Sequence, residues 1–341
     1  MDIARHNFAS PQQIPLADWR AILVRVFGRM MGDNLGVLAG GVAFYGFLSV
    51  FPAIAGALMV WGRLSGAWTV SAHLDTLRGL APGTATALLT EQMARVAAQS
   101  EKDLTLGAVV TVIFALWSAS RGVTALMGAM NMAYHEKEKR GFFRLNGLAI
   151  GFTLAGIMFV SLSLAVIAAV PPILESLFLG ALVQAAIHLI RWLLLVALFM
   201  LASALIYRFG PSRQKARWAW ILPGASAAAL VWLIASLVFS LYIANFNAYS
   251  ATFGPLGAVA ALLMWFWLSA YAVCMGAELN SQLELFTIQD TTTGPQRAPG
   301  ERGAFVADHI EAPQTASGPT SDQPDVKIPK EAERIAAREL G

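Results

Sequence analysis

The chain has 341 residues, of which 57% are hydrophobic and 13% are charged, whereas about a quarter of the residues in a soluble globular protein are charged. A net charge of +3 is too small to indicate a dedicated nucleic-acid-binding protein. The single cysteine, Cys274, excludes an internal disulfide and a thiolate cluster for zinc or iron. The composition therefore indicates a membrane protein.

Long stretches without an ionised side chain mark the candidate membrane-crossing helices, because a charge in the hydrocarbon costs several kcal/mol. About 20 apolar residues cross a bilayer as a helix. The gaps predict an all-α, polytopic membrane protein whose membrane domain, residues 34–285, is a six-helix transmembrane bundle. The predicted spans cover about 36–62, 104–120, 146–170, 187–207, 219–244 and 257–277.

The basic residues predict the orientation, since Lys and Arg near the ends of spans are retained on the cytoplasmic side. The segment before the first span, the loops after the second and fourth spans, and the C-terminal tail hold 19 of the 24 Lys and Arg residues. This distribution predicts a multi-pass protein with cytoplasmic N and C termini.

Three segments lie outside the predicted spans. Residues 1–33 are interpreted as a cytoplasmic N-terminal segment without a removable signal. The first external loop, 63–103, is expected to contain an amphipathic helix, because apolar residues recur there at helical spacing. Residues 286–341 are predicted to be a disordered cytoplasmic tail, since so few large apolar residues cannot offset the entropy lost on ordering.

Arg121 interrupts an otherwise uncharged run and leaves two alternatives open. The favoured one ends the second span at Ser120 and makes Arg121 an interfacial anchor, followed by an interfacial helix over 122–134 with Asn131 on its polar side. In the other, the span continues and Arg121 needs a partner at membrane depth. Glu278 is then the candidate partner, because the second and sixth spans end at the same cytoplasmic level.

Two further polar groups are candidate sites. In the first span, proline frees a backbone carbonyl and can kink the helix. In the external turn 245–254, an ordinary helical hairpin is favoured over a re-entrant loop that contacts a substrate. The residues singled out in these groups are Tyr45, Ser49 and Pro52 in the span, and Asn245, Tyr249 and Gly254 in the turn.

Two glycine pairs at a spacing of four predict close helix packing. They are Gly36 with Gly40 and Gly147 with Gly151, and such steps let helix backbones approach. Packing within one bundle is favoured, and a seam between two copies in a homo-oligomer is the alternative.

No catalytic, cofactor or metal site is predicted. The five histidines fall in five separate segments, and HEKEK at 135–139 lacks the second histidine of a zinc-protease motif. The sequence also contains no phosphate-binding glycine loop before a lysine. We therefore expect the chain not to be an enzyme.

Several motifs in one order resemble a known family. AFYGFLSVFPAIAGALMVWG at 43–62, LWSASRGVTALMGAMNMAYHEKEKRGFFR at 116–144, PGASAAALVWLIASLVFSLYIANFNAYSATFGPLGAV at 223–259 and GAELN at 276–280 resemble the YihY/virulence factor BrkB family of bacterial inner-membrane proteins. The resemblance covers about residues 21–285. It implies six spans with both termini inside, a role in envelope integrity, and transport of a lipid or solute. The resemblance further implies that the family's former ribonuclease BN label is a misassignment.

Two functions follow as expectations. The first is a transporter or flippase of a lipid or amphipathic envelope component, with a cavity lined by Tyr45, Ser49, Arg121 and Asn280. The alternative is a non-transporting envelope scaffold, which a solid bundle would favour. In both cases the expected partners are membrane lipids, with no nucleic acid and no cofactor.

Overall fold

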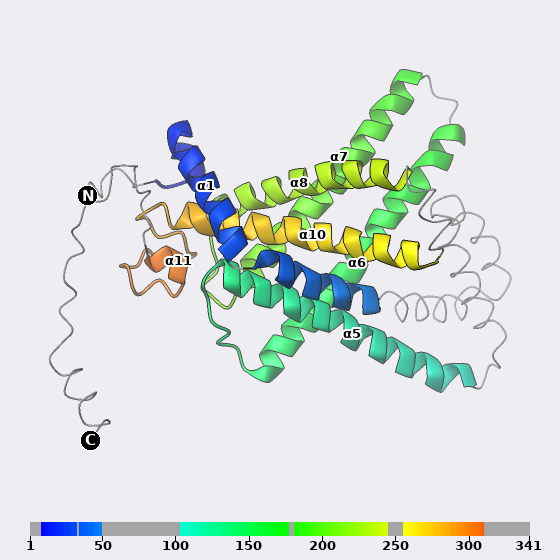
Figure 1. Cartoon of the computed structure of the whole chain (residues 1–341), viewed down its shortest axis with the longest axis horizontal. Coiled ribbons are helices and arrows are strands. Elements are labelled where there is room, and N and C mark those ends of the chain that lie inside the picture. The colour runs from blue at the N-terminus through cyan, green and yellow to red at the C-terminus, as the bar shows by residue number, and fades with distance from the viewer. Residues whose placement is uncertain (1–7, 33, 50–102, 177–180, 245–254, 310–341) are drawn as a thin grey trace. The chain divides into compact units, whose positions relative to one another are not determined.

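The computed structural model describes residues 8–32, 34–49, 103–176, 181–244 and 255–309 (Figure 1). These ranges are mostly helical, and their one β-type pairing is an isolated bridge between Ala216 and Thr292. The labelled elements in chain order are η2 (Pro11–Gln13), α1 (Leu16–Gly32), α5 (Asp103–Ala133), α6 (Phe142–Ser176), α7 (Ala181–Phe209), α8 (Trp218–Ala244), α10 (Pro255–Glu284) and α11 (Phe305–Asp308). An apolar helix over Leu35–Ser49 follows α1.

The prediction of an all-helical membrane protein is confirmed, because each predicted span is helical wherever it is described, although residues 50–62 of the first span lie outside the described residues. Four of these helices are long and apolar enough to cross a membrane within those residues, and the helix Leu35–Ser49 is shorter. The count of six crossings stays a prediction. The four candidate spans are Phe142–Phe159, Leu189–Phe209, Trp218–Ile243 and Val259–Glu284.

The favoured alternative ends the second span at Ser120 and expects a separate interfacial helix over 122–134, but α5 is one helix that continues through Arg121 to Ala133. Arginine is a good helix former, so a charge can end an apolar stretch without ending the helix. The hydroxyl of Ser120 donates to the carbonyl of Trp117 at 2.7 Å. The hydroxyl of Thr124 donates to the backbone carbonyl of Ser120 at 2.9 Å. These polar side chains are therefore satisfied within the helix.

The closest helix contact joins α8 and α10 at two glycines. A Cβ atom on Gly276 would overlap the hydroxyl of Tyr207 and the carbonyl of Gly224, and would lie 2.8 Å from the Cβ of Ala228. The Tyr207 hydroxyl donates to the carbonyl of Val273 at 2.7 Å, which ties α7 to α10 at the same level. Small residues thus let three helices share one packed core.

The two glycine pairs of the sequence behave differently. Gly36 and Gly40 face the ring of Trp267 on α10, whose indole N–H donates to the carbonyl of Gly36 at 2.9 Å. A Cβ on Gly147 or Gly151 would meet no atom within 4 Å. The first pair therefore packs within the chain, whereas the second lies on an exposed face of α6.

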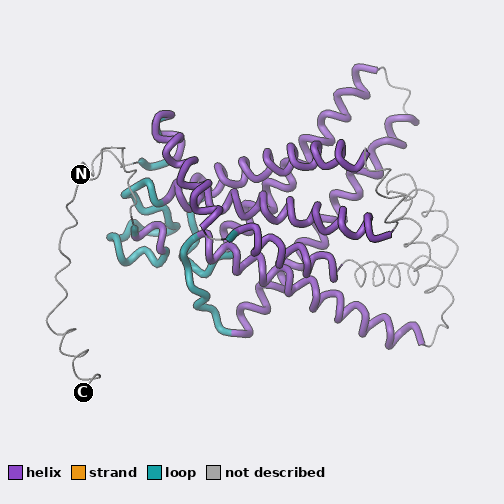
Figure 2. Tube along the Cα trace, in the orientation of Figure 1, coloured by secondary structure: helices purple, strands orange, loops and turns teal. Residues whose placement is uncertain are grey.

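Loops at one end of the helices form a folded layer, which we call the end layer and define as residues 134–141, 210–217 and 285–309 (Figure 2). The prediction of disorder from residue 286 is wrong for 286–309. The N–H of Arg217 donates to the carbonyl of Thr291 at 2.9 Å, and the buried guanidinium of Arg302 donates to three backbone carbonyls. Hydrogen bonds order this segment, and an argument from apolar content misses them. The rest of the predicted tail, 310–341, lies outside the described residues.

Candidate functional site

The helix Leu35–Ser49 lies directly against α5, and we call the line of contact between them the seam. A Cβ on Gly122 would lie 3.4 Å from the Cβ of Tyr45 and 3.5 Å from the backbone nitrogen of Gly46. The glycine in α5 therefore allows close approach at this point. The predicted residue Tyr45 lies here. Ser49 follows one turn further along the same helix, and its hydroxyl donates to the carbonyl of Gly46 at 2.7 Å.

Arg121 lies on the exposed side of α5, next to Gly122 at the seam. Its guanidinium carbon lies 5.6 Å from the centroid of the Trp117 ring, which in turn lies 5.7 Å from that of Phe114. Within the described residues no carboxylate forms an ion pair with Arg121. Arg121 precedes Ala133, the last residue of α5, by 12 residues, which is about 18 Å of helix. The charge is thus exposed well inside the length of the helix.

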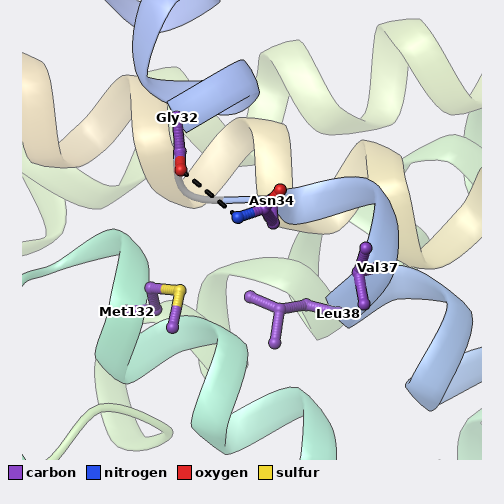
Figure 3. A pocket seen from close by; sticks show the side chains of 5 residues that line it. All are labelled: Gly32, Asn34, Val37, Leu38 and Met132. Carbon is purple, nitrogen blue, oxygen red and sulfur yellow. Dashed lines mark hydrogen bonds between the residues drawn. The ribbon is translucent and has the colours of Figure 1, made fainter.

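A groove of about 390 Å³ opens at the end of the seam near the end layer (Figure 3). Val37 and Leu38 line it from the short apolar helix, and Met132 lines it from α5. Asn34, which has a positive φ of 51°, adds a side-chain amide that donates to the carbonyl of Gly32 at 3.5 Å. The groove therefore combines apolar walls with polar groups at the joint between α1 and the next helix.

The structure does not bring Arg121 to Glu278, so the alternative that paired them is not supported. Glu278 is buried and accepts a hydrogen bond from the side chain of Gln282 at 3.0 Å. Arg121 lies on the exposed face of another helix. An equal depth along two helices does not make their side chains face each other.

Asn280 connects α10 to the first turns of α8 and does not line the seam. The N–H of Gly224 donates to its Oδ1 at 2.7 Å, and its Nδ2 donates to the carbonyl of Ile221 at 3.0 Å. Pro223 lies between these two residues and disturbs the helical ladder, because proline lacks an N–H. The buried amide of Asn280 therefore has a structural role between the two helices.

Asn131 connects α5 with two loops of the end layer. Its Nδ2 donates to Oε2 of Glu138 at 2.9 Å, and its Oδ1 accepts from the N–H of Ser212 at 2.7 Å. Arg140 binds both oxygens of Glu138 at 2.7 Å and donates to the carbonyl of Gly210 beyond the end of α7 at 2.7 Å. Asn131 is therefore buried in a polar network and not placed on the polar side of a separate interfacial helix.

The Arg140 bonds determine how Glu138 responds to acid. The hydrogen bonds from Arg140, supported by that from Asn131, lower the pKa of Glu138 from 4.5 to about 2. A carboxylate with a lowered pKa stabilises the fold above its unfolded pKa, and this contribution is lost as the pH falls from about 4.5 towards 2. In detergent, we expect Glu138→Gln to lower the free energy of unfolding by about 1–2 kcal/mol at neutral pH.

The difference between wild type and Glu138→Gln should shrink as the pH is lowered through this range. Urea titrations at several pH values between 3 and 7 measure it, with pH intervals chosen around the pKa values of folded and unfolded Glu138. Glu301→Gln is a matched control, because Glu301 is an exposed carboxylate of the same end layer. A difference that stays constant across the titration would contradict the assignment.

A buried ion pair that the sequence analysis missed joins the end layer to the end of α10. Arg213 donates from Nη1 to Oε1 of Glu284 at 3.1 Å and from Nη2 to Oε2 at 2.6 Å, and the two side chains are 2% and 0% exposed. The Arg213 guanidinium also lies over the ring of Tyr134 at 4.9 Å, and the Thr291 hydroxyl donates to Glu284. Burial works to lower the pKa of Arg213, but the Glu284 carboxylate outweighs burial and raises it. Arg213 therefore keeps its positive charge beside Glu284.

The remaining predicted site residues cannot be compared with the structure. Pro52, Asn245, Tyr249 and Gly254 lie outside the described residues, as does the first external loop. Within the described ranges, no three His, Cys, Asp or Glu side chains form a group that could hold a metal ion.

Comparison with known proteins places the chain in a family. The model of the virulence factor BrkB family matches residues 26–301, which is most of the chain. The chain belongs to the BrkB family. The matched range ends inside the end layer, so most of that layer is part of the BrkB domain and not an appended tail. The family and the apolar helices together identify a BrkB-type membrane protein.

Individual relatives of this BrkB-family protein match shorter stretches. The ribonuclease-like protein YfkH of Bacillus subtilis is 34% identical over 176 residues, which are 50% of this chain and 64% of that protein. A UPF0761 membrane protein of Idiomarina loihiensis is 35% identical over 101 residues, 29% of this chain and 35% of that protein. A UPF0761 membrane protein of Xanthomonas campestris is 35% identical over 94 residues, 28% and 22% of the two chains.

The chain spans less than two thirds of the length of these relatives in each match. No solved structure matches the chain.

Proposed function

We propose that this BrkB-family protein is a transporter or flippase that moves an anionic lipid, or another anionic amphiphile, along the seam. The observation that carries the proposal is the exposed guanidinium of Arg121, about 18 Å along α5 from the helix end. An arginine at such a depth in a membrane helix is costly unless it meets an anion or water. A phosphate headgroup that passes the seam supplies that anion.

The groove supports a lipid-like substrate over a small hydrophilic one. It lies at the end of the seam, where Met132 on α5, the helix of Arg121, and Val37 and Leu38 on the facing helix give it apolar walls. Asn34 adds a hydrogen-bonding amide. Binding sites for amphiphiles combine such apolar walls with a few polar groups. In the proposal the groove receives the amphiphile and Arg121 binds its headgroup further along the seam.

The proposal includes an orientation and a location. The end layer carries basic residues of two loops that the charge distribution assigns to the cytoplasm. We infer a bacterial inner membrane with six crossings, both termini cytoplasmic, and the groove open at the cytoplasmic leaflet. No enzymatic reaction is assigned to the chain, and the ribonuclease-like name of the Bacillus subtilis protein is taken as describing that protein only.

Redistribution of labelled lipid in liposomes tests the proposal. Purified protein should speed the transfer of a fluorescent phosphatidylglycerol between leaflets, measured as the fraction bleached by external dithionite. We expect Arg121→Gln to slow this transfer about tenfold or more, because the headgroup loses its charged partner at membrane depth. Arg121→Lys should keep part of the rate, since lysine retains the charge but not the planar fork.

Two controls test whether the effect depends on the position of the arginine and on the charge of the lipid. Arg191→Gln removes an arginine from α7, away from the seam, and should leave the rate unchanged. A labelled phosphatidylcholine should respond less to Arg121→Gln than phosphatidylglycerol does. Transfer no faster than in protein-free liposomes would overturn the proposal. Wild-type rates in Arg121→Gln would contradict a role of Arg121 in binding the headgroup.

A non-transporting envelope scaffold is the second candidate, and the folded end layer is the observation that favours it. Residues 285–309 pack against the loop 210–217 through backbone hydrogen bonds, so this end offers a fixed surface to partners. A scaffold predicts no lipid transfer by the pure protein in liposomes. The same assay therefore decides between the two functions.

A further inference from the structure

The helix α1 has two apolar faces, and other described residues bury only one of them. Its inner face consists of the buried Ile22, Val26 and Met30, and α1 packs on α10. Its outer face is exposed within the described residues, with Phe27 60% and Met31 82% exposed. The outer face consists of Leu16, Leu23, Val24, Phe27 and Met31. A soluble protein rarely leaves such a contiguous apolar stripe open to water.

Polar residues of α1 gather on the opposite side of the helix. At about 100° per residue, Asp18, Arg25 and Arg29 fall on one edge, and the inner and outer apolar faces adjoin each other away from it. Arg20 lies at the N-terminal part of the outer face and is exposed. An amphipathic helix with basic residues beside a broad apolar face is typical of a helix that lies in the plane of a membrane surface.

The position of α1 agrees with a place at the membrane surface. Figure 1 shows α1 crossing the end of α10 and not running along it. The apolar helix Leu35–Ser49 begins three residues after α1 ends at Gly32. This next helix exposes Val37, which is 74% exposed, so the outer face of α1 is followed directly by another exposed apolar surface.

We propose that the outer face of α1 docks into the leaflet at the end-layer side of the membrane and binds anionic lipid there. Acyl chains contact Phe27 and Met31, while Arg20 reaches out from the apolar face to a phosphate, as long basic side chains do at interfaces. Three arginines against one aspartate give α1 a positive charge that complements an anionic leaflet. The helix thereby fixes the joint at Asn34, which lines the groove.

Probes at two adjacent positions of the full-length protein test the proposal. Phe27→Cys and Gly28→Cys are each labelled with an environment-sensitive fluorophore in a Cys274→Ala background and reconstituted into phosphatidylcholine–phosphatidylglycerol vesicles. Gly28 is a matched control, because it is exposed, lies about 100° around the helix from Phe27, and a Cβ there meets no atom within 4 Å. If Cys274→Ala folds poorly, native Cys274 can stay, since it is buried and reacts slowly.

The proposal expects opposite quenching patterns at the two positions. Lipid-borne nitroxide should quench the probe at Phe27 about threefold more than the probe at Gly28, and aqueous iodide should show the reverse, as for a helix in the interface plane. In vesicles of phosphatidylcholine alone, or with Arg20→Gln, the nitroxide quenching at Phe27 should fall.

Three results would overturn the proposal. Equal iodide quenching at both positions would place the outer face in water. A disulfide between two Phe27→Cys copies, with no lipid quenching, would assign the face to a second copy of the chain. Lipid quenching at Phe27 that is unchanged by Arg20→Gln and by the absence of anionic lipid would contradict the binding of a lipid headgroup by Arg20. None of these measurements depends on lipid transfer, so their failure is separate from failure of the proposed function.

Discussion

Arg213→Ala is expected to lower the free energy of unfolding by about 3–5 kcal/mol, because it leaves the carboxylate of Glu284 buried without its countercharge. Glu284 is 0% exposed and receives two hydrogen bonds from the guanidinium. Thr291 retains its bond to Glu284, but one hydroxyl cannot replace a bidentate cation. Unfolding in detergent by sodium dodecyl sulfate or urea, followed by tryptophan fluorescence, measures the loss.

A double variant separates the charge from the packing. Arg213→Met with Glu284→Leu removes both charges and keeps apolar volume, and it should recover most of the stability that Arg213→Ala loses. Lys137→Ala is the matched control from the same layer, because Lys137 is an exposed basic residue of that layer. We expect that control to cost less than about 1 kcal/mol. Equal losses in Arg213→Ala and Lys137→Ala would refute the role of burial.

The helices could be predicted from the sequence, but their ends could not. Gaps between charges place the described part of each predicted span on a helix, since apolar runs of this length favour one structure in lipid. The same rule ends the last span at Ala277, although α10 continues to Glu284. Glu278 and Asn280 lie inside that helix and are buried, and Asn280 binds α8. A charge marks a change of surroundings, not the end of a helix.

The partners of the polar residues could not be predicted, because they are distant in the sequence. Asn131 is a candidate from the sequence alone, yet its partner Ser212 lies 81 residues away. Arg213 and Glu284 are separated by 71 residues, and Arg213 enters the sequence argument only as one basic residue of a loop. Neither Arg213 nor Glu284 has an opposite charge near it in the sequence, which indicates that each needs a distant partner. That observation does not say which distant residue is the partner.

Among the candidate site residues, those on a predicted helix could be located from the sequence, but the neighbours of their side chains could not. Tyr45 and Arg121 are found at the seam, with Ser49 one turn beyond Tyr45, because they lie on helices that the apolar pattern already identifies. Asn280 is expected from the sequence to line the same cavity, but its side chain instead binds α8. Depth follows from counting residues along a helix, whereas the direction of a side chain depends on which neighbour the helix packs against.

Gly276→Ala is expected to lower the free energy of unfolding by about 3 kcal/mol, because the added methyl group has no room between α8 and α10. It would overlap the Tyr207 hydroxyl and the Gly224 carbonyl, and it would lie 2.8 Å from the Cβ of Ala228. Backbone atoms cannot move aside as a flexible side chain can, so the helices must separate and the bond from Tyr207 to Val273 is strained. Thermal unfolding in detergent measures the shift.

The sign of the control distinguishes crowding from a general effect of alanine. Alanine is a better helix former than glycine by about 1 kcal/mol, so a glycine with open space around it should gain stability when replaced. Gly147 and Gly151 on α6 are such positions, and Gly147→Ala should leave stability unchanged or raise it. Gly224→Ala should resemble Gly276→Ala, because its Cβ would lie 2.5 Å from the Cγ of Asn280. If all four glycines respond alike, the α8–α10 contact is looser than the structure has it.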